Sequence, residues 1–457
     1  RGRLDEVGRL DILETVGKRL MASYDKQDLA RLDADALGRR ARVQLLLGEI
    51  ENSRGNLAAA LKTYQSAAAT TAELLARDPD EPQRMFDHAQ SLYWVGYIAW
   101  QRGDFAAAKR QFEGYDRMAD GLLAANPNKI EWQLEKSYAQ SNLGTVASDS
   151  GDLDASSRHF ATALAIDRRH YQLKPRDADV VIQYGSTLSW LARVEGRRFD
   201  FARSESLYRE GAELFAKAAA ADPQDQSLQL QLAVTTKQHA IALVDTGRLR
   251  DAEQQGLRAR DLTGAIVVRD PQNALAKEYL AGAILALAQI ASARGNHGAA
   301  DQYARDALGL LETLNKAGVA RTSRQSDIAS AAELVRARAA EASGDLRRSR
   351  ELYALVSASA ARRGLDQAGS LNVSIVAAAE TALAGLTRDP RHWRTVIDTV
   401  RKAKGVPNPH ASAQAGYALI ATGDRARGLA MLERLRNGGY RHPDFLTLLK
   451  RAGVPAQ

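Results

Sequence analysis

The residue types that most often carry chemistry are sparse in this chain and poorly spaced for it. Among 457 residues there are eight histidines and no cysteine. No two histidines follow the His-x-x-x-His or His-Glu-x-x-His pattern, which would put two zinc ligands on one face of a helix. Without cysteine the chain also has no thiolate nucleophile, disulfide or cysteine-ligated metal. We therefore predict no metal site, no cofactor and no redox chemistry. The histidines are His88, His159, His170, His239, His297, His392, His410 and His442.

Motifs for nucleotide binding and acyl transfer are missing as well. The sequence has no Gly-x-x-x-x-Gly-Lys, no Gly-x-Gly-x-x-Gly and no Gly-x-Ser-x-Gly, each of which requires a strand-to-helix turn. Close carboxylates such as Asp78 and Asp80 flank Pro79, where turn formation explains them. We predict that the chain is not an enzyme.

One group of aromatic residues has the spacing of a helix face. Tyr93, Tyr97 and Trp100 stand at i, i+4 and i+7, offset from the apolar positions around Val95. Rigid rings give a binding surface a large contact area at low entropic cost. The alternative is that the next repeat covers them and that they belong to the packing.

The segments that must position these residues follow a strict repeat. Five prolines lie 48 residues apart, a register too regular for chance, and a series of glycines lies 24 residues before the proline positions. Each repeat therefore has two halves. The prolines are Pro79, Pro127, Pro175, Pro223 and Pro271, and the glycines are Gly55, Gly103, Gly151, Gly247 and Gly295.

The glycine and the proline have different physical roles. Glycine adopts positive φ at a helix end, and a short polar residue follows it here, as in Gly103-Asp104. Proline disfavours helix at the preceding residue, which ends the second helix of each repeat. Between these signals the apolar residues follow a helical period, and there is no sustained period-2 run of β-branched residues, which would indicate a strand. We predict an all-α chain of antiparallel helix pairs, with a reshaped turn at Phe199, where the glycine is missing.

Within this frame the residues resemble the tetratricopeptide repeat (TPR) family. The first repeat carries Leu47-Gly48, Gly55-Asn56-Leu57, Ala60 and Tyr64, and the third carries Leu143-Gly144, Gly151-Asp152-Leu153 and Phe160. The usual unit of the family has about 34 residues, so the extra length here predicts about two more turns on each helix. The resemblance implies a right-handed superhelical solenoid of about seven elongated repeats over residues 36–360.

The small residues of the pattern predict close helix crossings. Glycines such as Gly96 on first helices should let the backbones approach, while rings such as Phe112 fill the space towards the neighbouring repeat. Because each repeat contacts only its neighbours in such an array, we expect local contacts and no long-range core.

The family resemblance implies that the first helix of each pair lines the inner, concave face. The predicted partner-binding residues on that face are Tyr93, Tyr97, Trp100, Asn142, Thr145, Arg193 and Lys237. The implied partner is a protein or a peptide, and self-association is left open.

The two ends depart from the register. Residues 1–35 read as a capping or linker helix, and its sequence resembles the segment that joins an effector domain to a repeat array in large bacterial signalling proteins. Residues 361–457 read as divergent helical repeats with a closing helix around Pro443 to Arg451.

The net charge is +8, and residues 390–457 alone hold 12 Lys or Arg against 4 Asp or Glu. We favour a solvated face of the terminal helices over a nucleic-acid site, because no recognised nucleic-acid module accompanies this charge.

The function predicted from the sequence is a non-catalytic protein-interaction scaffold. The alternative is a regulatory or sensor segment of a bacterial signalling protein whose effector domain lies upstream of residue 1, and nucleic-acid association is the least favoured. The longest uncharged stretch, residues 406–423, contains two prolines and a histidine, so no membrane span is expected. We expect a cytoplasmic location, or a periplasmic one if an upstream anchor exists.

Overall fold

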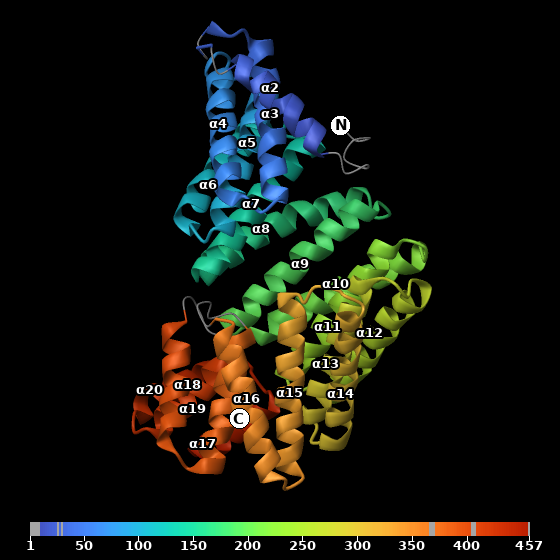
Figure 1. Ribbon diagram of the computed structural model, residues 1–457, viewed down its shortest axis with the longest axis vertical. Coiled ribbons are helices and arrows are strands. Elements are labelled where there is room, and N and C mark those ends of the chain that lie inside the picture. Colours follow the sequence, from blue (N-terminus) through green and yellow to red (C-terminus); the bar gives the residue numbers. More distant parts are fainter. Residues whose placement is uncertain (1–9, 25–26, 29–30, 365–370, 404–407, 456–457) are drawn as a thin grey trace. The chain divides into compact units, whose positions relative to one another are not determined.

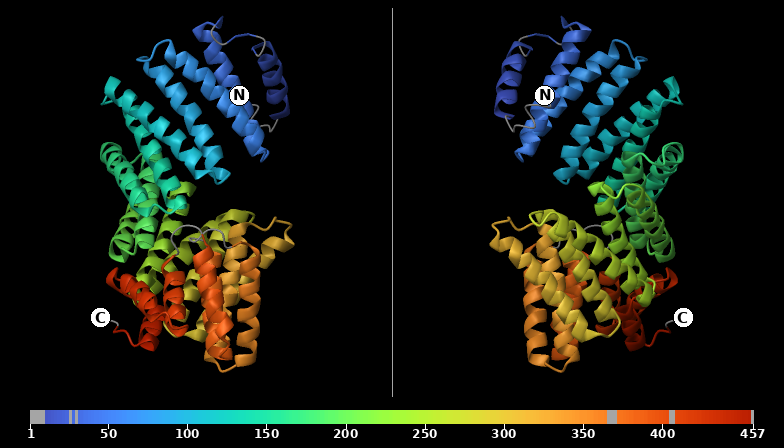
Figure 2. Two further views of the ribbon diagram at one scale, coloured as in Figure 1. Left: turned by 90° about the vertical axis from the view of Figure 1, so that its left-hand side faces the viewer. Right: turned by 90° about the vertical axis from the view of Figure 1, so that its right-hand side faces the viewer.

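The computed structural model describes residues 10–24, 27–28, 31–364, 371–403 and 408–455. This part of the chain forms twenty helices and no strand (Figures 1 and 2). The helices divide into two compact units, residues 1–170 and 171–457. The prediction of an all-α helical-repeat fold is therefore confirmed.

Unit 1 begins with α2 (Leu10–Tyr24), and residues 1–9 of the predicted entry helix lie outside the described part. Three antiparallel pairs follow, in which each helix packs against the next along the chain. They are α3 (Ala34–Ser53) with α4 (Leu57–Ala76), α5 (Pro82–Gln101) with α6 (Phe105–Ala125), and α7 (Ile130–Ser150) with α8 (Leu153–Leu173).

Unit 2 continues the same pairing and then shortens. Its full-length pairs are α9 (Ala178–Arg198) with α10 (Phe201–Ala221), α11 (Gln226–Asp245) with α12 (Leu249–Arg269), α13 (Ala274–Ala293) with α14 (His297–Lys316), and α15 (Ser323–Ala342) with α16 (Leu346–Arg362). The shorter helices are α17 (Leu371–Thr387), α18 (Pro390–Lys402), α19 (Pro409–Ala421), α20 (Arg425–Asn437) and α21 (Pro443–Ala452).

The turn inside each pair uses the repeated glycine as the sequence predicts. Gly103 has φ +76°, and its N–H donates to the carbonyl of Trp100. The next residue, Asp104, caps the second helix, because its carboxylate accepts the N–H of Ala107 at 2.9 Å. Two adjacent residues thus end one helix and begin the next.

The prediction of a reshaped turn at Phe199 is wrong. Phe199 takes the left-handed conformation itself, with φ 70° and ψ 27°, and its N–H donates to the carbonyl of Gly196 at 3.2 Å. The turn is kept although the residue has a Cβ, which costs about 1–2 kcal/mol. The Phe199 ring is 7% exposed and belongs to a buried cluster, so packing of the side chain offsets this strain.

The repeated glycines on first helices leave space for an aromatic ring from the second helix of the same pair. A Cβ on Gly48 would lie 2.5 Å from the Tyr64 ring, and one on Gly96 would lie 2.8 Å from the Phe112 ring. The prediction of close crossings is therefore right, but the ring fills the notch at its own glycine rather than only the space towards the next repeat. Gly185 and Phe215 repeat this contact in unit 2.

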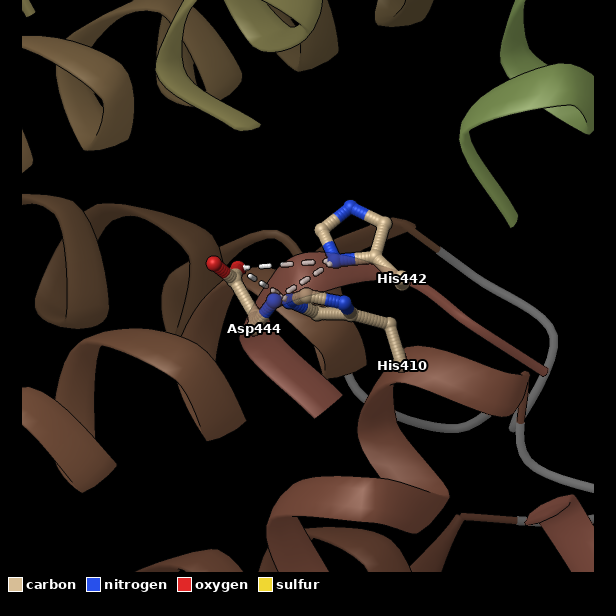
Figure 3. Close-up of side chains that lie close together, drawn as sticks. All are labelled: His410, His442 and Asp444. Carbon is tan, nitrogen blue, oxygen red and sulfur yellow. Dashed lines mark hydrogen bonds and ion pairs between the residues drawn. The ribbon is translucent and has the colours of Figure 1, made fainter. Parts of the chain in front are cut away.

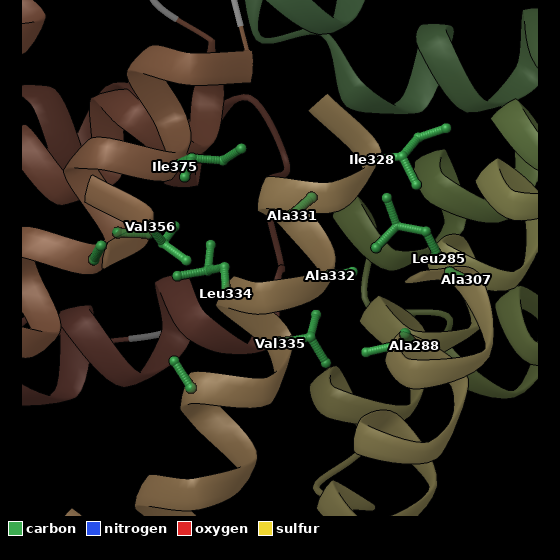
Figure 4. Packing of buried hydrophobic residues seen from close by; sticks show 14 of the residues in the cluster. Leu285, Ala288, Ala307, Ile328, Ala331, Ala332, Leu334, Val335, Val356 and Ile375 are labelled. Atoms are coloured by element: carbon green, nitrogen blue, oxygen red, sulfur yellow. The ribbon is translucent and has the colours of Figure 1, made fainter. Parts of the chain in front are cut away.

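The largest apolar cluster of unit 2 runs through α13 to α17 (Figure 4). Leu285, Ala331, Leu334 and Ile375 show how residues from successive first helices join it. Within the described residues, α13 is also the one helix long and apolar enough to cross a membrane, but 56% of its apolar window is buried inside the protein. Its composition is therefore explained by its place in the core.

A second cluster joins segments more than two hundred residues apart. Phe199 and Phe201, at the start of α10, pack against Tyr440 and Phe445, and the Phe201 and Tyr440 rings lie 4.8 Å apart. The Phe201 N–H donates to the carbonyl of Gly438, and the Arg441 N–H donates to the carbonyl of Asp245 at 2.7 Å. The expectation of local contacts alone is wrong, because the C-terminal helices of unit 2 fold back onto its first turns (Figures 1 and 2).

Candidate functional site

The predicted aromatic residues lie together along α5 in unit 1. The Tyr93 and Tyr97 rings are 6.0 Å apart, and the Tyr97 and Trp100 rings are 5.8 Å apart. All three are half-buried. Tyr93 also packs against Phe112, whereas the Trp100 indole N–H donates to Asp149 at 2.7 Å. We call Tyr93, Tyr97 and Trp100 the aromatic strip.

The remaining predicted residues divide between the two units. Asn142 and Thr145 lie half-buried on α7 in unit 1, and each donates to a backbone carbonyl of its own helix. Arg193 and Lys237 belong to unit 2, on α9 and α11. The Arg193 guanidinium stacks on Trp190 at 4.1 Å, and burial together with the Arg324 charge lowers the pKa of Lys237 to about 8.

Unit 2 contains a cavity of about 280 Å³ that sequence reasoning did not find. Four first helices, the start of α19 and the turn before α21 surround it. Two of its apolar residues, Ile241 and Leu371, keep 41% and 38% of their surface exposed although they line the cavity. The lining consists of Ile241, Val244, Asp245, Ala286, Gln289, Ile290, Ala293, Ala331, Leu334, Val335, Arg338, Leu371, Ser374, Ile375, Asn408, Pro409, His410, Tyr440 and His442.

A cluster of titratable residues adjoins this cavity, which Arg338, His410 and His442 line. Figure 3 shows the two histidines beside Asp444. Asp444, at the start of α21, accepts a charged contact from the Arg338 guanidinium of α15 at 2.8 Å. The same carboxylate oxygen lies 3.8 Å from Nε2 of His410 and 4.0 Å from Nδ1 of His442. The two imidazole rings meet edge to face at 5.2 Å. The Arg338–Asp444 pair therefore connects the middle of the repeat array to the helix that closes unit 2.

The electrostatics of the cluster favour one charged pair and two neutral imidazoles. Burial raises the pKa of Asp444, but the Arg338 charge and the two histidines outweigh it and hold that pKa well below its usual range. Burial lowers the pKa of His410 to about 3, and burial also lowers the pKa of His442. Near neutral pH the cluster thus carries one positive and one negative charge.

His410, His442 and Asp444 have the residue types of a metal site, and their ligand atoms lie within 4.8 Å of one another. Two contacts compete with a metal. Arg338 already holds the Asp444 oxygen, and Nδ1 of His442 accepts the backbone N–H of Asp444 at 3.2 Å. A cation would have to displace a guanidinium and a helix cap, so the arrangement fits a structural ion-pair network better than a zinc site.

Asp245 differs from every other charged residue on the cavity wall. It is the last residue of α11, and its carboxylate has no hydrogen bond or ion pair among the described residues. Burial raises its pKa to about 7. Asp245 is half-buried, and a carboxyl group that is partly removed from water without a partner is less favourable in its charged form. The cavity therefore contains one uncompensated acidic group.

Sequence reasoning missed these residues for a definite reason. Asp245, Arg338, His410 and Asp444 lie on four different helices, so no local spacing connects them. The available signals were weak: two histidines, His410 and His442, each beside a proline at the start of a predicted helix, and the loss of the repeat register after residue 360.

The solved structures that resemble this chain are helical-repeat proteins. The apo form of RapI matches with a TM-score of 0.54 and 13% identity over 87% of this chain and 97% of that one. A tetratricopeptide repeat protein from Parabacteroides merdae matches with a TM-score of 0.39 and 14% identity over 71% of this chain and 98% of that one. No protein-family model and no curated protein matches the sequence. The chain has the TPR-like helical-repeat fold.

Proposed function

We propose that this chain is a non-catalytic interaction scaffold that binds a peptide or a protein segment along the first helices of its repeats. The observation that carries the proposal is the aromatic strip of unit 1. Three half-buried rings at i, i+4 and i+7 lie on a first helix, beside the buried residues that hold the repeat together. Such rings are the preferred anchors of protein interfaces.

The three rings are not equivalent, and this difference decides the experiment. Tyr93 contacts Phe112 and Tyr115 in the core of its pair, so its removal would also test folding. Trp100 is held by Asp149 of α7. Tyr97 contacts the rings of Tyr93, Trp94 and Trp100 on its own helix, and it also packs against the buried cluster around Tyr64. Among the described contacts it has no ring contact or side-chain hydrogen bond to another helix, so Tyr97→Ala is the preferred substitution, with helicity and thermal unfolding measured alongside.

The test is a selection of binding peptides from a random displayed library, followed by affinity measurements on purified variants of the full chain. Tyr97→Ala should weaken binding of the selected peptides roughly tenfold, a typical effect for an interface anchor. Leu355→Ala is the control, because Leu355 lies on a second helix, α16, with 58% exposure, and this substitution should leave the affinity unchanged. Equal affinities for the parent and Tyr97→Ala would refute the strip as the binding surface.

A second candidate function is a regulatory segment that senses a small ligand. The cavity of unit 2 favours it, since four first helices and the closing turn before α21 surround the same space. A ligand there would contact the C-terminal helices and the array together. The upstream effector domain, the bacterial signalling role and the cytoplasmic or periplasmic location remain predictions.

A further inference from the structure

We infer that the cavity of unit 2 is a binding site for an alkylammonium group, with the ammonium held by Asp245 and the aliphatic part in contact with the apolar walls. The ligand chemistry is a protonated amine attached to a short apolar body. The inference concerns unit 2 alone and does not depend on the aromatic strip of unit 1.

The size of the cavity restricts the ligand. Its volume of about 280 Å³ is nearly twice the roughly 150 Å³ of an engineered apolar cavity that holds benzene. A body of about ten non-hydrogen atoms is therefore the appropriate scale. An alkylamine of about eight carbons or an amino-acid amide with a free α-amino group, such as leucine amide, meets this limit.

The walls supply an apolar surface that nothing in the described chain covers. Ile241 is 41% exposed and lies one helical turn before Asp245 on α11, so both residues face the same side. Leu371 of α17, which is 38% exposed, and Leu334 of α15 line the same space. Burial of such surface by an aliphatic ligand stabilises a complex by about 25 cal/mol per Å².

The charged residues around the cavity favour a ligand with a positive charge. Arg338 is paired with Asp444 at 2.8 Å, so its positive charge is already compensated. Asp245 lines the cavity and its carboxylate has no hydrogen-bond or ion-pair partner among the described residues, so the carboxylate oxygens are available as acceptors. An ammonium would supply the missing charge and up to three donors.

Other cations fit less well. Calcium and magnesium require several oxygen ligands, and Asp245 is the one carboxylate among the lining residues. A metal would also leave the apolar walls uncovered. An anionic ligand would face the Asp245 carboxylate and an Arg338 guanidinium whose charge is already compensated by Asp444.

The experiment measures binding to the purified full chain by titration calorimetry near pH 8. The probes are octylamine, octanol and octanoate, which share the aliphatic part and differ in the charge of the head group. Octylamine should bind, with octanol at least tenfold weaker and octanoate without measurable binding. Equal affinities of the three probes would show an unselective apolar cavity and overturn the inference.

Two further probes distinguish the source of the amine. Leucine amide carries a free α-ammonium group, and its N-acetylated form does not. Binding of octylamine alone assigns the cavity to small amines, whereas binding of free leucine amide, but not of the acetylated form, assigns it to peptide amino termini. Both results support the ammonium site, and absence of binding by both amines up to millimolar concentration would refute it.

Substitution of Asp245 tests whether the ammonium of the ligand contacts this carboxylate. Asp245→Asn removes the charge with little change of shape and should weaken octylamine binding at least tenfold. Asp261→Asn is the matched control, because it removes one carboxylate from the exposed side of α12, where the side chain is 66% exposed. Unchanged binding by folded Asp245→Asn would overturn the assignment.

A second variant keeps Asp245 in place. Ile241→Lys puts an ammonium one turn before the carboxylate, within reach of an i, i+4 ion pair. This tethered amine should compete with octylamine and abolish its binding while the helical content stays that of the parent. If folded Ile241→Lys still binds octylamine with the affinity of the parent, the ammonium does not sit at Asp245.

Discussion

Gly438 lies against the carbonyl oxygen of Phe199, so closely that a Cβ at this glycine would come within 1.9 Å of that oxygen. The backbone of Gly438 is ordinary, with φ −73° and ψ −5°, so conformation does not require a glycine here. The close approach of two backbone segments requires it. This contact is where the C-terminal helices of unit 2 meet the turn between α9 and α10.

Gly438→Ala should therefore loosen the C-terminal helices from the rest of unit 2. Because the clash is with backbone, a side-chain rotation cannot relieve it, and we expect a loss of about 3 kcal/mol in the free energy of unfolding. Urea unfolding and the rate of tryptic cleavage after Arg441 measure it. Gly309→Ala on α14 is the control: no atom lies within 4 Å of its Cβ, so it should stabilise by about 0.5–1 kcal/mol. Similar stabilities of the two variants would contradict the docking described above.

Two Gly→Ala substitutions should change the stability in opposite directions, because only one of the two glycines lies against an aromatic ring. In Gly185→Ala the new Cβ would lie 2.2 Å from the Phe215 ring, and the expected cost is about 1–3 kcal/mol. In Gly264→Ala no atom lies within 4 Å, and the gain in helix propensity should stabilise the chain. Thermal unfolding compares them. Phe215→Leu should partly rescue Gly185→Ala, and the absence of any coupling between the two changes would argue against the notch.

Asp245 should make unit 2 less stable as the pH rises. Burial raises its pKa to about 7, above the usual value of 3.8, so the folded state holds the proton more tightly than the unfolded state. The stability contribution of the protonated form is present below about pH 4 and is lost as the pH rises to about 7. Tyr208 of α10 and Tyr440 interact with the Asp245 charge, and Arg441 donates its backbone N–H to the Asp245 carbonyl. Arg338, His410 and His442 line the same cavity.

Asp245→Asn removes this dependence. At pH 8 the variant should exceed the parent by about 1 kcal/mol in the free energy of unfolding, because it no longer holds an unpaired charge at a half-buried position. At pH 4.5 the two proteins should differ little. Urea titrations at both pH values decide the question, and a variant less stable than the parent at pH 8 would show that the carboxylate has a favourable partner.

The two histidines should act in the opposite direction. Burial lowers the pKa of His410 to about 3 and lowers that of His442, so the unfolded state binds protons that the folded state excludes. Their contribution to stability is present above about pH 6.5 and is lost as the pH falls towards 3. The facing charges are Arg338 and Asp444, and the Asp444 carboxylate stays ionised throughout this range.

The measurement is made in the Asp245→Asn background, where the opposing titration is absent. Between pH 7 and pH 4.5 the stability of this protein should fall, and a further His410→Asn change should reduce the fall. Tryptic cleavage after Arg441 should accelerate over the same range if the C-terminal helices detach first. A stability independent of pH in this background would contradict the neutral, buried state of His410.

The repeat architecture was determined by the sequence because its signals are local. A glycine with positive φ, the aspartate after it and the proline 24 residues later act within one or two helical turns, as Gly103 and Asp104 show. The contact between Phe112 and Gly96 could also be predicted from the sequence, since both positions recur with the period of the repeat. The aromatic strip could be placed on one helix face for the same reason.

The closure of unit 2 and its cavity were decided by the tertiary structure. Phe199 meets Gly438, and Arg338 meets Asp444, across separations that no periodic pattern encodes. Phe199 keeps a glycine-like turn because a distant aromatic cluster holds its ring, which local propensity could not foretell. Asp245 is unusual only because five other segments surround it. Such features depend on where the superhelix returns to itself, and this follows from the summed geometry of many repeats rather than from any one of them.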